Sequence, residues 1–140
     1  MRLYSDDLIK LDCTRGTGIL YAAWQGQRPY AAEEVRKAFI AVVACARERP
    51  VTRLLLNFAD NTQDLTEAAY KGMLGQLAVG LLPTSVRRIA CVGTGSAVRE
   101  RRIASAYREI AAALEAPLEF QFFSKRIEAL RWLTQEGPPS

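Results

Sequence analysis

An apolar segment that stops at a polar loop is the clearest structural signal in this chain of 140 residues. Residues 53–58 read Arg-Leu-Leu-Leu-Asn-Phe, which has the length and apolar character of a buried strand in a parallel sheet. Residues 59–66 are mostly polar and lead into a helical pattern. In an open α/β sheet, ligands bind beyond the carboxyl ends of the strands. We therefore expect an α/β fold with its ligand or switch residues at this junction.

The remaining elements alternate along the chain. Residues 9–13 alternate apolar and polar side chains, and a glycine-containing turn separates them from an apolar strand at 19–24, which predicts an antiparallel hairpin. Prolines and glycines then divide the sequence into helices and further strands. The expected helices are residues 30–49, 65–82, 97–115 and a short one that Ser124 caps and that carries Ile127, Leu130 and Leu133; the expected strands after the hairpin are 53–58, 88–92 and 118–122.

This order predicts a single-domain α/β sandwich. Helices between successive strands imply parallel pairing with right-handed crossovers. We expect an N-terminal antiparallel hairpin joined to a mostly parallel mixed sheet of five or six strands, with about four helices. The domain should span residues 1–136, and residues 137–140, Gly-Pro-Pro-Ser, should be a disordered tail.

The composition argues against several kinds of chemistry. The chain has no histidine, which removes the commonest general base and zinc ligand, and also Ser-His and Cys-His nucleophile pairs. Its three cysteines, Cys13, Cys45 and Cys91, are far apart in apolar or alternating segments, so we expect buried free thiols in a reducing cytoplasm. We predict no catalytic residue, metal or cofactor. The start lacks the apolar core of a signal peptide, and the longest apolar run, residues 77–83, is too short for a membrane span.

Positive charge is concentrated in the second half of the chain. The net charge is +4, and residues 71–140 carry the whole excess. Such a patch could attract phosphate or nucleic acid, but no nucleic-acid motif accompanies it and few aromatic residues are interleaved. A solvated helix face is the favoured interpretation. The arginines concerned are Arg87, Arg88, Arg99, Arg101, Arg102 and Arg108.

Nearly the whole chain resembles the STAS-like, SpoIIAA-like bacterial domains. The resemblance is carried by the hairpin that ends in residues 20–26, the strands at 54–60 and 88–92, and the terminal pattern of residues 120–124 and 128–133. These motifs are mostly structural. What the family implies is a non-enzymatic module that binds proteins, apolar molecules or nucleotides.

The resemblance also gives a meaning to the loop after the central strand. In anti-sigma-factor antagonists of the wider STAS family, this loop carries a phosphorylatable serine in an Asp-Ser-Ser-Gly type motif. Here serine and glycine are both missing. Thr62 or Thr66 could occupy the helix start, but neighbouring carboxylates would repel a phosphate, so capping and turning are the favoured roles. The expected ligand or partner loop consists of Asn57, Asp60, Thr62, Asp64 and Thr66.

A second candidate site opens the helix at residues 97–115. Two glycines and two hydroxyl groups follow a strand there, where backbone amides can hold an anion. However, Val98 stands where a dinucleotide fingerprint needs its third glycine, and no Gly-Lys-Ser/Thr follows. A plain turn with a serine cap is favoured over an anion site. The residues of that site would be Thr94, Gly95, Ser96, Arg99 and Arg102.

The third candidate is the apolar helix at residues 65–82. Its three interior glycines each cost about 1 kcal/mol relative to alanine, and close packing or a partner could offset that cost. A helix without a polar face is expected to be covered on all sides. The favoured account is a central crossover helix covered by its neighbour. The alternative is an apolar groove or dimer face along Gly72, Gly75, Val79 and Leu82.

Three functional classes follow from these features. The leading one is a non-catalytic regulatory or binding module that acts through protein contacts with a partner or as a homodimer. The second is a small-ligand binder that takes an anionic or apolar molecule with the loops at the carboxyl ends of the strands. The third, an enzyme with Asp60 or Asp64 as general base, is the least favoured because histidine and a paired nucleophile are missing.

Overall fold

The computed structural model describes residues 2–5, 9–14, 18–24, 32–57, 67–92, 97–115 and 118–135. Six strands and four helices lie in these ranges, and the expected tail at 137–140 falls outside them. The elements are β1 (Arg2–Ser5), β2 (Ile9–Thr14), β3 (Ile19–Trp24), α1 (Ala32–Glu48), β4 (Arg53–Asn57), α2 (Glu67–Leu81), β5 (Arg88–Val92), α3 (Ala97–Leu114), β6 (Glu119–Phe123) and α4 (Arg126–Leu133).

The strands form one mixed sheet in the order β1-β2-β3-β4-β5-β6. The predicted hairpin is β2 and β3, paired antiparallel with Ile9 opposite Trp24. From β3 onward all pairs are parallel, with Leu54 of β4 beside Leu20 and Ile89. The predicted fold class is therefore confirmed. The antiparallel strand β1, which precedes the hairpin, was not predicted, because four residues are too few for a clear alternating pattern.

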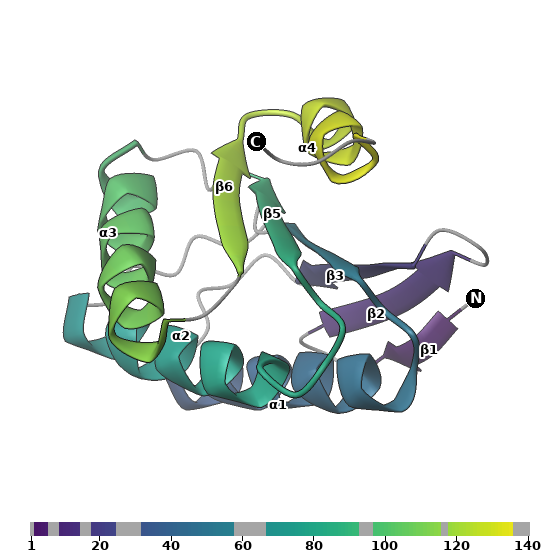
Figure 1. Ribbon diagram of the computed structural model, residues 1–140, viewed down its shortest axis with the longest axis horizontal. Helices are drawn as coiled ribbons and strands as arrows, with labels where there is room; N and C mark the ends of the chain where they lie inside the picture. Colours follow the sequence, from purple (N-terminus) through teal and green to yellow (C-terminus); the bar gives the residue numbers. More distant parts are fainter. Residues whose placement is uncertain are drawn as a thin grey trace.

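The two faces of the sheet are covered by different helices (Figure 1). Every parallel connection steps to the next strand in the same direction, so right-handed crossovers place α1, α2 and α3 on one face. The short helix α4 packs on the other face, against β4, β5 and β6. Leu54 and Leu56 belong to the core beneath the three helices, whereas Leu55 belongs to the core beneath α4. This double coverage explains why β4 is apolar throughout.

The cap of α4 differs from expectation. Ser124 does not cap the helix: Lys125 holds the N-cap position, and the Ser124 hydroxyl donates instead to Glu128 Oε1 at 3.1 Å. Of the apolar residues named for this helix, Ile127 is 55% exposed and Leu133 is buried, and Ala129 is buried as well. The buried side of α4 is thus set by its contact with the sheet, and a helix of eight residues carries too little periodicity to define it.

Helix α2 lies between α1 and α3 and packs against both. It buries Leu74, Leu77, Ala78 and Leu81, but Val79 is 53% exposed. The expectation that an apolar helix is covered on all sides is therefore wrong for its outer side. Within the described ranges, no helix combines the length and the apolar character needed to cross a bilayer.

Candidate functional site

The strand-end loop is described at one of its five predicted positions. Asp60, Thr62, Asp64 and Thr66 lie outside the described residues. Asn57 ends β4, and its Nδ2 donates to the Tyr21 hydroxyl at 2.8 Å. The Arg126 guanidinium lies 4.4 Å from the centre of the Tyr21 ring. Asn57 thus belongs to a polar cluster that joins β3, β4 and the start of α4.

The order of the described strands does not provide the crevice that usually holds a ligand at such a junction. Open α/β sheets form their ligand crevice at the point where strand order reverses and neighbouring crossovers go to opposite faces. Here β3 to β6 follow one another in sequence order, so their crossovers share a face. The described part of the sheet has no such switch point. The ligand loop stays a prediction from the sequence.

Most residues of the predicted anion site also lie outside the described residues. Thr94, Gly95 and Ser96 are not described, and Arg99 lies in the first turn of α3, where only its backbone is described. Arg102 is half-buried on α3. The wider arginine group is divided between elements, because Arg88 faces α4 while Arg101 and Arg108 are exposed on α3. The anion site therefore stays a prediction, and the described arginines of the basic patch lie on different elements.

A groove with a volume of about 540 Å³ lies between α1 and α2 on the helical face. Gly75 and Val79, from the predicted groove or dimer face, both line it. Gly72 and Leu82 are exposed and do not. Arg47 and Gln76 are its polar members. The remaining lining residues are Phe39, Ile40, Val43, Ala44, Leu77 and Gly80.

Gly80 sets how closely the two helices approach at this groove. A β-carbon at position 80 would lie 2.7 Å from Val43 Cγ1 and 3.0 Å from its Cγ2. At Gly75 the nearest neighbouring atom would be Ile110 Cδ1 at 3.9 Å, and at Gly72 nothing lies within 4 Å. Only Gly80 of these three is thus required by close packing, which accounts for one of the three costly glycines.

The α1 side of the groove was missed by the sequence analysis. Ile40 is 55% exposed, and Glu33 and Arg47 stand seven residues to either side of it on the exposed surface of α1. A spacing of seven is close to two helical turns, so the three side chains share one face. In the sequence, the groove could have been indicated by Ile40, an apolar residue outside the buried stripe that includes Phe39, Val42 and Ala46. A single exposed isoleucine is too common to mark a surface by itself.

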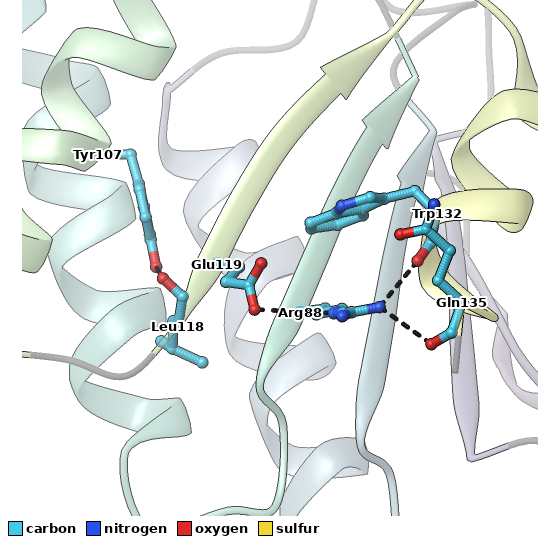
Figure 2. A network of polar contacts seen from close by, with 6 residues as sticks. All are labelled: Arg88, Tyr107, Leu118, Glu119, Trp132 and Gln135. Carbon is cyan, nitrogen blue, oxygen red and sulfur yellow. Dashed lines mark hydrogen bonds and ion pairs between the residues drawn. The ribbon is translucent and has the colours of Figure 1, made fainter. Parts of the chain in front are cut away.

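On the opposite face, Arg88 fixes the end of α4 against the sheet (Figure 2). One of its terminal nitrogens donates to the Trp132 carbonyl at 2.9 Å and to the Gln135 carbonyl at 3.4 Å. Its Nε lies 3.7 Å from Glu119 Oε1, and the guanidinium is 5.4 Å from the Trp132 ring centre. A cation at a helix C-terminus complements the partial negative charge there. This cluster stabilises the position of α4.

The titratable groups on the core side are held in their neutral forms. Burial raises the pKa of Cys45, and it raises the pKa of fully buried Cys91 further. Burial, with a smaller contribution from Cys91, raises the pKa of Tyr107 to about 12. The Tyr107 hydroxyl donates to the Leu118 carbonyl at 3.0 Å. Raised thiol pKa values disfavour the nucleophilic thiolate. No group of metal-ligating side chains occurs within the described ranges.

Comparison with known proteins addresses the fold. No family model and no curated protein matches the sequence. The structure is similar to that of an uncharacterized protein from Shewanella loihica PV-4, which is described as a DUF3478 family member with a SpoIIAA-like fold. The two chains are 18% identical, the match covers 94% of this chain and 98% of the other, and the TM-score is 0.51. The sheet order and this similarity together show that the chain has a SpoIIAA-like fold.

Proposed function

We propose that this chain is a non-catalytic binding module that acts through protein–protein contacts, and that a second copy of itself is its partner. The observation that carries the proposal is the exposed apolar surface at the α1/α2 groove. Ile40 and Val79 are each more than half exposed beside it. Contiguous exposed apolar surface on a small domain is typical of an interaction site.

The charge pattern of α1 favours a second copy over an unrelated partner. In a twofold-symmetric contact with two α1 helices antiparallel and crossing at Ile40, residue 33 of one copy faces residue 47 of the other. Glu33 and Arg47 would then form two equivalent opposite-charge contacts around a central Ile40 pair. Such self-complementarity is what an isologous interface requires. The acidic first turn and basic last turn of α1 support the antiparallel direction.

The non-catalytic part of the proposal is supported by the chemistry of the chain. It has no histidine, and burial keeps the Cys45 and Cys91 thiols protonated. The hydroxyl of Tyr107 is committed to the Leu118 carbonyl. General acid–base catalysis needs a group whose pKa lies near the working pH, and these groups do not provide one.

Sedimentation velocity over a concentration series tests the proposal. The unmodified chain should sediment as a dimer that dissociates on dilution, and Ile40→Asp should be monomeric. Ile127→Asp is a matched control, because Ile127 is also 55% exposed but lies on α4. It should dimerise like the unmodified chain. A monomeric unmodified chain at all concentrations, or an Ile40→Asp variant that still dimerises, would contradict the proposal.

A small apolar ligand with an anionic group is the second candidate, and the groove volume favours it. About 540 Å³ lies within the range of small-molecule pockets, about 300–1,000 Å³, and Arg47 lies in the lining beside apolar side chains. Thermal melting with decanoate, decanol and nucleotides tests it. Decanoate should raise the melting temperature, and Arg47→Gln should reduce the shift. Unchanged melting with all three probes would contradict this candidate.

A further inference from the structure

Within the described residues, the outer edge of β6 is an open strand edge. In the described sheet, β6 is the last strand and pairs with β5 alone. The Glu119 N–H donates to the Arg87 carbonyl at 2.8 Å, so the backbone groups of Glu119 are directed toward β5. Because successive residues of a strand direct these groups to opposite sides, those of Phe120 and Phe122 point away from β5. They form a template for another strand.

A groove runs along this edge. It has a volume of about 370 Å³ and lies between β6 and α3. Figures 1 and 2 place α3 beyond β6, on the side away from β5. Tyr107 of α3 stacks on Phe120, with ring centres 4.4 Å apart. A chain that paired with β6 would therefore run beside α3 and place alternate side chains against Phe120 and Phe122, which are both half-buried.

The charge of the groove favours an acidic occupant. Arg101 and Arg108 line it, are exposed, and outnumber Glu100, its one acidic lining residue. Their seven-residue separation corresponds to about 10 Å along α3. This places two positive charges along the path of an extended chain. Glu119, the only charged residue of β6, lies beside Arg88 on the α4 face and does not oppose an acidic segment.

We propose that the β6 edge and α3 form a docking surface for an extended acidic segment of another protein, which adds to the sheet as a seventh strand. The outward backbone groups of Phe120 and Phe122 supply the hydrogen bonds, and the rings of these two residues contact the apolar side chains of the segment. Arg101 and Arg108 attract its carboxylates. This is the β-augmentation mode of peptide recognition. A second copy fits less well, because pairing the β6 edges of two copies would bring their α3 helices into the same space. This surface is separate from the α1/α2 groove.

Backbone amide exchange of the full chain tests the strand addition directly. The probe is a hexapeptide that alternates glutamate and valine, and the control alternates lysine and valine. With the acidic peptide, exchange at Phe120 and Phe122 should slow about tenfold or more, while Gln121, already directed toward β5, should change little. The lysine peptide should leave Phe120 and Phe122 unprotected. Unchanged exchange at both positions with saturating acidic peptide, or protection confined to α1 and α2, would overturn the proposal.

Fluorescence polarisation with the same labelled acidic peptide tests the charge contribution. The double variant Arg101→Glu/Arg108→Glu should bind about tenfold or more weakly, since it replaces attraction by like-charge repulsion. Lys125→Glu/Arg131→Glu is the matched control, with the same change of charge at exposed positions outside the groove. It should bind like the unmodified chain. Equal losses in both double variants, or no loss in either, would overturn the proposal.

Discussion

Replacing Gly80 by alanine tests the contact that shapes the α1/α2 groove. The new β-carbon would lie 2.7, 3.0 and 3.4 Å from Val43 Cγ1, Cγ2 and Cβ. Carbon atoms pack best at about 3.5–4.0 Å, so α1 and α2 would have to separate by up to about 1 Å. Rotation of Val43 gives little relief because both of its methyl groups are close. Overpacking of this kind costs about 1–3 kcal/mol, against a gain in helix propensity of about 1 kcal/mol.

Gly72→Ala is the matched control, because nothing lies within 4 Å of a β-carbon there. It should raise the free energy of unfolding by about 0.5–1 kcal/mol through helix propensity alone. Gly80→Ala should be less stable than Gly72→Ala by about 1–3 kcal/mol in urea denaturation, with an unchanged denaturant slope. Adding Val43→Ala to Gly80→Ala should remove most of the steric cost. If Gly80→Ala stabilises the protein as much as Gly72→Ala does, the proposed close approach is wrong.

Three further predictions concern the buried polar and titratable groups. Tyr107→Phe should lower stability by about 1 kcal/mol, because the Leu118 carbonyl loses its donor. In the folded protein the pKa of Tyr107 is about 12, above its usual value near 10, so the stability gained from its neutral hydroxyl is present below pH 10 and is lost as the pH rises through 12. Above pH 10 the stability of Tyr107→Phe should therefore fall less steeply with pH than that of the unmodified chain. Parallel curves of stability against pH would contradict this. Cys91 is buried with a raised pKa, so iodoacetamide should label it only as fast as the protein opens, and mass spectrometry showing rapid labelling of native protein would refute its burial. Arg88→Met should lower the free energy of unfolding by about 2 kcal/mol, because the Trp132 carbonyl loses a charged donor. It should also change tryptophan fluorescence. Unaltered stability and emission would show that α4 is held without Arg88.

The sequence predicted the fold well where long elements carry strong periodicity. Strand Arg88–Val92 has the predicted bounds, and α1 lies within the predicted range 30–49. Short elements were harder to predict. β1 has too few residues to show alternation, and the buried side of α4 depends on which side chains meet the sheet rather than on an internal pattern.

Candidate sites depend on tertiary neighbours, which local sequence patterns do not show. The sequence indicated an unusual α2, but it could not show that Val43 of α1 is the reason for Gly80. Nor could it show that Ile40 and Val79 lie beside the same groove. The order of strands in the sheet brings together residues that are far apart in the chain, and local periodicity does not predict that order.

Mixing two charge variants tests the central claim of dimerisation through α1 most directly. In the antiparallel contact, Glu33→Arg and Arg47→Glu each create two like-charge contacts, so each variant alone should dimerise at least about tenfold more weakly than the unmodified chain. An equimolar mixture should form a heterodimer, because both contacts again join opposite charges. Sedimentation velocity of each variant and of the mixture measures this. Recovery of dimer only on mixing is the predicted result, and two variants that remain equally weak when mixed would contradict the account.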